Sequence, residues 1–195
     1  MAELSRRHLV VSGLAGAGAS LLPGSSREAN AATSIRYNLA SPNGQVMLKK
    51  YAQAVKLGAE PVAVTLAPPA AGKALSARVA SVGENRKVYL VARGLGTDEP
   101  PETIYQIYLG LPPGVAPDPN GIYYVGSLNF FNAVGRSAEA GHADPRFLSF
   151  DVTALLRSLQ SRNSLGDNTT VTIVPAGTPR ASAKPVIGEV TLVEQ

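Results

Sequence analysis

The sequence predicts a mainly β protein: an antiparallel β-sandwich or barrel of about seven strands with one short helix, preceded by an amphipathic helix. Short runs rich in valine, isoleucine, threonine and aromatic residues recur along the chain, and clusters of turn-forming residues separate them. The 195 residues include 19 glycines and 15 prolines, and only 16% are charged, which indicates a turn-rich body rather than a helical bundle. The hydrophobic content of 45% is sufficient to build a core.

Residues 1–31 have the pattern of an export signal. Arg6 and Arg7 precede a weakly apolar stretch from Leu9 to Leu22, and Ala29 and Ala31 form the small-x-small pattern that signal peptidases cleave. This arrangement resembles a bacterial twin-arginine signal, which implies recognition by the Tat translocase and a periplasmic or secreted location. The apolar stretch is too short to span a membrane, so no membrane span is predicted.

Residues 32–60 are predicted to contain the amphipathic helix. Ser41 is a suitable N-cap and Pro42 suits the first helical position, while Gly58 and Pro61 mark the end. The apolar residues between Val46 and Leu57 fall on one broad helical face, which needs a surface to pack against.

The hydrophobic period changes from helical to two after Pro61. The predicted strands cover residues 62–66, 74–82, 87–93, 104–109, 122–131, 169–174 and 186–193. One helix interrupts them, with Asp151 as its N-cap, with Leu155, Leu156 and Leu159 on its buried side, and with Gly166 as its stop.

Few residues suit metal or nucleic-acid chemistry. The chain has two histidines, His8 and His142, and no cysteine. Copper, zinc and non-heme iron centres are built mainly from several imidazoles, so His142 is at most a weak candidate for one ligand. The net charge is +4 and the basic residues are scattered, which predicts no nucleic-acid surface.

Residues 61–195 resemble the C-terminal domain of polyphenol oxidases and tyrosinases. The resemblance rests on the runs at residues 87–94, 104–109 and 121–131, followed by the helix at residues 150–159, the strand Thr170-Val171-Thr172-Ile173-Val174-Pro175 and the closing strand at residues 186–192. Residues 35–39 and 49–55 are similar to the N-terminal segment of bacterial tyrosinases. The central domain of that family, which carries six copper-binding histidines, has no counterpart between these parts. The resemblance therefore divides the chain into a signal peptide (1–31), a tyrosinase-like N-terminal segment (32–60) and a C-terminal β domain (61–195).

The resemblance implies a protein that holds no cofactor itself, because the family's dicopper site belongs to the missing domain. In the family, the C-terminal domain lies over the entrance to the copper site and can place a side chain where the substrate would sit. The implied role is thus a non-catalytic cover or escort for a copper phenol oxidase supplied as a separate chain. Tyr123, Tyr124, Phe130 and Phe131 are the candidate shielding residues. Neighbouring strand residues face opposite sides, so one member of each pair must point outward.

Two other interpretations remain open. The chain could be a truncated or internally deleted tyrosinase that has lost its copper ligands. It could also be a periplasmic β-sandwich that binds a ligand, an interpretation favoured if the aromatic residues gather on an exposed concave face beside polar neighbours.

Overall fold

The computed structural model describes residues 45–68, 74–131, 133, 147–166 and 169–195. Contacts between Cα atoms divide the chain into residues 1–30 and residues 31–195, and every described residue belongs to the second unit.

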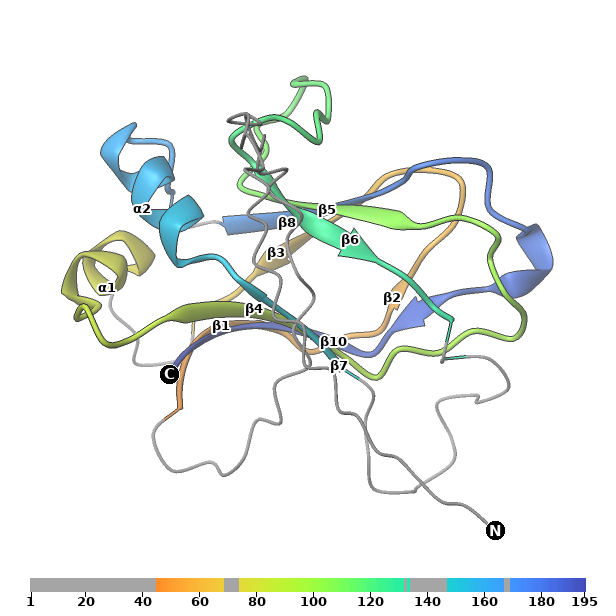
Figure 1. Cartoon of the computed structure of the whole chain (residues 1–195), viewed down its shortest axis with the longest axis horizontal. Coiled ribbons are helices and arrows are strands. Elements are labelled where there is room, and N and C mark those ends of the chain that lie inside the picture. The colour runs from red at the N-terminus through yellow and green to blue at the C-terminus, as the bar shows by residue number, and fades with distance from the viewer. Residues whose placement is uncertain (1–44, 69–73, 132, 134–146, 167–168) are drawn as a thin grey trace, which may run out of the picture. The chain divides into compact units, whose positions relative to one another are not determined.

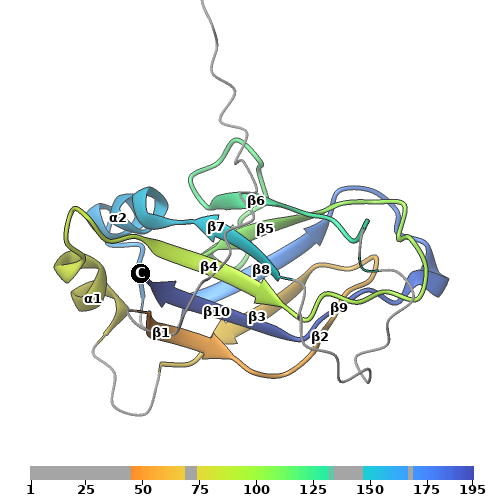
Figure 2. The ribbon, with the colours of Figure 1, turned by 60° about the horizontal axis from the view of Figure 1, so that its bottom comes forward.

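Two four-stranded antiparallel sheets form the body of this unit (Figures 1 and 2). The first sheet has the order β1 (Val46–Tyr51), β10 (Glu189–Glu194), β4 (Val88–Arg93) and β7 (Phe147–Asp151). The second has the order β3 (Val62–Leu66), β8 (Thr169–Pro175), β5 (Tyr105–Leu109) and β6 (Tyr124–Leu128). A small third sheet pairs β2 (Val55–Lys56) with β9 (Val186–Ile187). These open sheets confirm the predicted mainly β fold as a sandwich rather than a closed barrel.

Alternate residues of the facing strands build the core between the sheets. Because successive strand side chains point to opposite faces, each strand contributes every second residue. The buried set includes Leu90 and Ala92 of β4, Val190 and Leu192 of β10, Ile107 and Leu109 of β5, and Val171 and Ile173 of β8.

Two helices lie beside one another at one end of the sandwich, on the left in Figure 1. They are α1 (Leu75–Ser81) and α2 (Thr153–Ser161). The Gln160 side-chain amide of α2 donates a hydrogen bond of 2.9 Å to the Ser76 carbonyl of α1. On α2, Leu156 and Leu159 are fully buried, as the sequence predicts, and Leu155 is half-buried against the same core.

The predicted amphipathic helix before Leu57 is wrong where the structure describes it. Residues Val46–Tyr51 form strand β1, and Val55–Lys56 form strand β2. β1 pairs along its length with β10, apart from one bulge between Met47 and Lys49. Without β1, the strongly apolar strand β10 would be an exposed sheet edge, so tertiary pairing prevails over the weak helical preference of this segment.

The predicted strand at residues 74–82 is also wrong, because Leu75–Ser81 is helix α1. Its buried residues are Leu75 and Val79, and Val82 behind them is buried as well. The spacing i, i+4, i+7 is helical, and it places all three on one face.

The other element boundaries differ less. Helix α2 has Val152 as its N-cap and ends at Ser161, before the predicted stop at Gly166, while Asp151 Oδ1 accepts a hydrogen bond of 3.0 Å from the Thr153 amide. The strand predicted at residues 122–131 covers only Tyr124–Leu128. The sequence interpretation missed β7, which ends at the predicted capping residue.

Candidate functional site: an apolar pocket at the end of the second sheet

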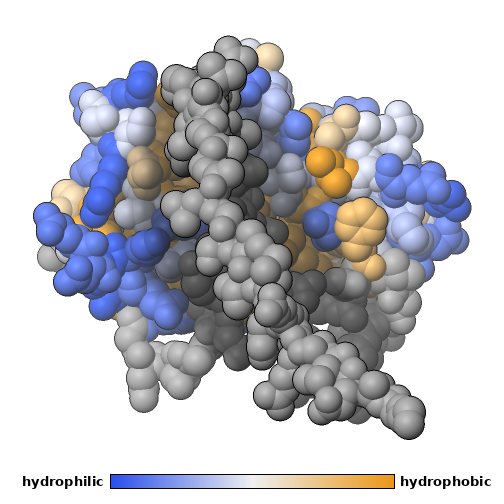
Figure 3. Space-filling view, in the orientation of Figure 1, coloured by the Kyte–Doolittle hydropathy of each residue, from blue (hydrophilic) through white to orange (hydrophobic). Residues whose placement is uncertain are grey.

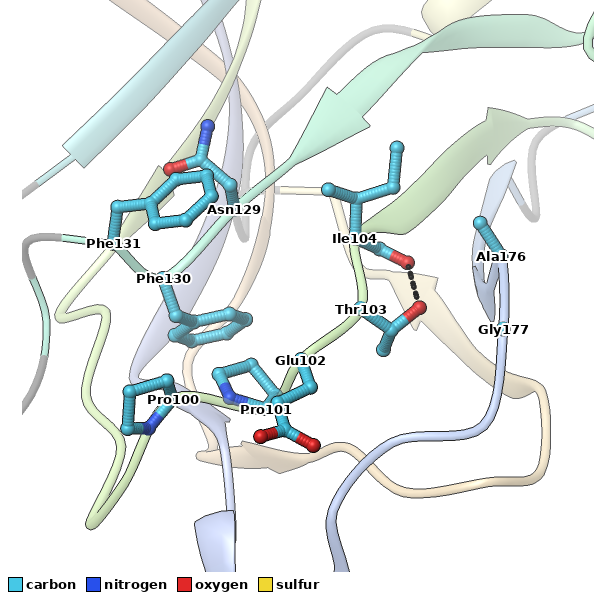
Figure 4. Close-up of a pocket in the computed structure, with 10 residues that line it drawn as sticks. All are labelled: Pro100, Pro101, Glu102, Thr103, Ile104, Asn129, Phe130, Phe131, Ala176 and Gly177. Carbon is cyan, nitrogen blue, oxygen red and sulfur yellow. Dashed lines mark hydrogen bonds between the residues drawn. The ribbon is translucent and has the colours of Figure 1, made fainter.

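Three neighbouring strands of the second sheet meet at one sheet end. Tyr105, the first residue of β5, lies opposite Leu128, the last residue of β6, and opposite Pro175, the last residue of β8. The residues just beyond these strand ends line a pocket of about 530 Å³ (Figure 4). The lining residues are Pro100, Pro101, Glu102, Thr103, Ile104, Asn129, Phe130, Phe131, Ala176 and Gly177.

The two phenylalanines of the pocket occupy opposite environments. Phe130 is 2% exposed, and its ring meets that of Tyr105 edge to face at a centroid distance of 5.9 Å. Phe131 is 80% exposed. This contrast agrees with the expectation that one member of the pair points outward. Figure 3 shows a few exposed hydrophobic residues on the right of the view, among pale and hydrophilic ones. Ile104 adds a second exposed apolar side chain to the pocket.

Tyr123 and Tyr124 are not among the residues that line this pocket. The Tyr124 ring lies 5.6 Å from that of Tyr108, and its hydroxyl is 2.8 Å from Ser127 Oγ. Both tyrosines are half-buried, and the Tyr123 carbonyl accepts a hydrogen bond of 2.9 Å from the Leu109 amide. Burial, with Tyr124 and Asp118 nearby, raises the pKa of Tyr108. The structure therefore brings together only the phenylalanine half of the four predicted shielding residues.

Arg180 joins the two loops that form one side of the pocket. Its backbone amide donates a hydrogen bond of 2.9 Å to the Pro101 carbonyl, and its guanidinium forms an ion pair with Glu102. A second, longer ion pair of 3.6 Å reaches Glu99. The hydrogen bond to Glu102, together with the charge of that carboxylate, raises the pKa of Arg180. These contacts tie the loop before β5 to the loop after β8.

Glu102 has a backbone conformation that is rare for a residue with a side chain. Its φ angle is +61°, in the left-handed region that favours glycine. A non-glycine residue there costs on the order of 1–3 kcal/mol, and such residues concentrate at binding and catalytic sites. The bend at Glu102 lies directly before Thr103 and Ile104, which line the pocket.

Tyr105 supports the pocket from below with a buried hydroxyl. The residue is 1% exposed, and its hydroxyl has no hydrogen-bond partner within the described residues. Burial raises the pKa of Tyr105. The ring therefore contributes packing under Phe130, while the hydroxyl contributes no described hydrogen bond.

Five of the residues predicted to be functional lie outside the part of the chain that the structure describes. They are Arg6, Arg7, Ala29, Ala31 and His142. Within the described part of the chain, no three histidine, cysteine, aspartate or glutamate residues are grouped so as to hold a metal ion. Nor does any described helix have the length and apolar character needed to cross a membrane.

Sequence reasoning found one wall of the pocket and missed the others. Residues 98–102 read as an acidic, proline-containing turn, and Ala176-Gly177 read as part of another turn. The available signal was their position, since one turn precedes β5 and the other follows β8. Two turns at the same end of neighbouring antiparallel strands lie close in space.

These features define the class of protein: an antiparallel β-sandwich domain with a mostly apolar pocket at one end of its second sheet. The sequence profile of a family described as a domain of unknown function, DUF7868, matches residues 47–195. The chain therefore belongs to the DUF7868 family. No curated protein matches it significantly.

Solved structures with similar folds include polyphenol oxidases. A latent aurone synthase (polyphenol oxidase) is 17% identical with a TM-score of 0.45, and the match covers 71% of this chain and 24% of that one. A latent apple tyrosinase is 16% identical with a TM-score of 0.47, and the match covers 72% of this chain and 27% of that one. The matched region thus corresponds to about a quarter of the length of each of these oxidases.

Proposed function

We propose that this protein is a non-catalytic cover or escort for a type 3 copper phenol oxidase carried by a separate chain. The sequence of residues 61–195 supports this, because it resembles the C-terminal domain that shields the copper site in tyrosinases and polyphenol oxidases. The proposal places the protein in the periplasm or outside the cell, after export by the Tat translocase through the twin-arginine pattern at Arg6 and Arg7.

The observation that carries the proposal is the exposure of Phe131. A phenylalanine ring that is 80% exposed leaves a large apolar surface in water, and burying such a side chain is worth about 1.5–3 kcal/mol. Directly before it, Phe130 is buried against Tyr105. Phe131 therefore lies just beyond the end of β6, next to a buried residue that anchors the chain, and this arrangement suits the insertion of a ring into the site of a partner.

The chemistry of this role is steric. A ring that enters the mouth of a copper site occupies the space of a phenolic substrate and excludes water, without itself transferring electrons or protons. The two histidines of this chain are too few to supply the six imidazoles of a dicopper centre. Any oxidation of phenols in the complex is therefore assigned to the partner.

The first test separates the cover from an oxidase. The chain, purified after export and loaded with copper, is assayed for catechol oxidation and for its copper content. The proposal predicts no turnover and no tightly bound pair of copper ions. Turnover by the chain alone would contradict it.

The second test measures association. A type 3 copper phenol oxidase from the same genome is mixed with the wild-type chain, with Phe131→Ala and with Met47→Ala, and binding is followed by calorimetry. Met47 is a matched control, since it is another exposed apolar side chain, at 43%, and does not line the pocket. We expect Phe131→Ala to weaken binding by about tenfold or more, the equivalent of 1.4 kcal/mol, and Met47→Ala to leave it unchanged.

A further inference from the structure

We infer that the pocket at the end of the second sheet is a binding site for a small, neutral aromatic molecule that carries one hydrogen-bonding group. This inference does not rest on the proposed cover function, because it concerns the isolated chain and a small ligand. Four properties of the pocket carry it: volume, fixed shape, wall chemistry and charge.

The volume suits a small organic molecule. Ligand pockets in proteins usually measure about 300–1,000 Å³, and this one measures about 530 Å³. The lining contains large apolar groups, so a ligand that binds there would cover apolar surface that is otherwise in contact with water.

One side of the pocket, formed by the loop before β5 and the loop after β8, is held in shape before any ligand arrives. The Ala176 amide donates a hydrogen bond of 2.9 Å to the Ile104 carbonyl, and Arg180 holds the opposite end of the same two loops through Pro101 and Glu102. The strained φ angle of Glu102 is maintained within this framework. A preformed pocket avoids the cost of ordering loops on binding, which favours affinity.

The walls favour a flat ring. Phe131 supplies an exposed aromatic ring and Pro100 an exposed, rigid saturated ring, while Phe130 and Pro101 are buried members of the same lining (Figure 4). Offset-stacked and edge-to-face aromatic pairs contribute about 0.5–1.5 kcal/mol beyond the burial of area. A planar aromatic ligand therefore gains more from this pocket than a flexible aliphatic chain of equal size.

Two side chains supply hydrogen-bonding capacity. The Thr103 hydroxyl lies 3.3 Å from the Ile104 carbonyl oxygen, a long distance for an O–H···O hydrogen bond, so it can donate to a ligand instead. The Asn129 amide forms no hydrogen bond with the other pocket residues drawn in Figure 4. An amide of this kind can both donate and accept.

The charge near the pocket disfavours anions. Glu102 and Glu99 are paired with Arg180, and Asp98 is paired with Lys184 at 3.3 Å. Three carboxylates stand beside two cations in this set, which leaves an excess of one negative charge. A carboxylate-bearing ligand is repelled, whereas a neutral alcohol or amide is not.

The experiment is an amide NMR titration of the full chain with benzyl alcohol and, separately, benzoate, which share a ring and differ in charge. We expect saturable shifts for benzyl alcohol at the amides of Thr103, Ile104 and Gly177, and binding of benzoate that is weaker by severalfold. Phe131→Ala should weaken the binding of benzyl alcohol by up to about tenfold, in line with the loss of one aromatic contact. Met47→Ala should leave the titration unchanged.

A second variant fills the pocket without straining the backbone. A Cβ atom at Gly177 would lie 3.3 Å from Thr103 Oγ1, and the backbone of Gly177 is not in the left-handed region. Gly177→Leu therefore adds bulk beside Thr103 and should abolish the titration, while its unperturbed spectrum elsewhere shows that the fold is kept. Non-saturable shifts, equal affinity for benzoate, or undiminished binding by Gly177→Leu would each overturn the inference. None of these results bears on association with a phenol oxidase, which is measured separately.

Discussion

Phe130 and Phe131 are neighbours in the chain and differ in exposure from 2% to 80%. One ring completes the core beneath the pocket, and the other extends the apolar surface at its mouth. The difference gives each residue a separate expected role, stability for Phe130 and binding for Phe131.

Alanine substitutions should separate these roles. Phe130→Ala removes a buried ring that contacts Tyr105, and it should lower the free energy of unfolding by about 3–5 kcal/mol. Phe131→Ala should change it by no more than about 0.5 kcal/mol, as is usual for exposed positions. Urea denaturation of both variants measures the two values. Equal losses in both would show that Phe131 is part of the core.

The hydroxyl of Tyr105 gives a second prediction at this scale. Tyr105→Phe removes a buried hydroxyl without a described partner, so the free energy of unfolding should stay constant or rise. Tyr108→Phe is the matched control, because the Tyr108 hydroxyl donates a hydrogen bond of 2.7 Å to Gln106 Oε1. Its loss should cost about 1 kcal/mol. Thermal or urea unfolding of both variants measures these changes in the free energy of unfolding. A clear loss of stability in Tyr105→Phe would reveal a partner for that hydroxyl.

The lowered pKa of Asp151 predicts how the stability of the fold depends on pH. Burial alone would raise the pKa of this carboxyl, but hydrogen bonds from Thr153 and Lys87 outweigh burial and lower the pKa from 3.8. The charged form is therefore favoured in the folded state. Its contribution to stability is present above about pH 4 and is lost as the pH falls through the lower folded value. The substitution Asp151→Asn should thus reduce the stability of the fold at pH 7. On acidification to pH 3, this variant should lose less stability than the wild type. Parallel losses in the two proteins, measured by urea midpoints, would contradict the assignment.

Strand β1 shows at the element scale what sequence patterns can and cannot predict. Six of the seven predicted β runs contain strands, because their period of two and their bounding turns are strong local signals. The segment of β1 has no period of two, because Val46, Met47 and Leu48 are consecutive and two lysines follow, so its sequence also fits a helical face. Only pairing with the distant strand β10 decides between helix and strand. Helix α1 was mistaken for strand although Leu75, Val79 and Val82 have helical spacing. For short segments of this kind, the elements against which they pack decide whether they form helix or strand.

Lys50 provides a test of β1 as a strand. Its amide donates a hydrogen bond of 2.9 Å to the Ala67 carbonyl, its carbonyl accepts one of 3.0 Å from the Ala67 amide, and its ammonium group pairs with Glu189. Lys50→Pro removes the amide donor and should lower the free energy of unfolding by about 1–3 kcal/mol beyond the loss in Lys50→Val, which removes only the ion pair. If residues 46–51 were helical instead, the Cα atoms of Met47 and Leu48 would show helical chemical shifts, and the strand assignment would fail.

At the scale of the whole molecule, the pocket arises from topology rather than from any one motif. Its residues come from three parts of the chain, around Ile104, Phe130 and Gly177, and the pairing order β8-β5-β6 brings them to one sheet end. Adjacent aromatic residues could be identified in advance as a pair with one outward member. The opposite wall could not, since glycine and proline turns have similar local sequences wherever they lie. The proposed cover function likewise uses a surface to which several segments of the chain contribute.

The most direct test of the cover function is the kinetic form of inhibition. Catechol oxidation by a type 3 copper phenol oxidase from the same genome is measured at several concentrations of wild-type chain and of Phe131→Ala. If the Phe131 ring occupies the place of the substrate, the wild-type chain raises the apparent KM for catechol and leaves kcat unchanged. Phe131→Ala should need about tenfold more protein for the same effect. A fall in kcat at constant KM, or equal inhibition by the two proteins, would contradict the proposed cover.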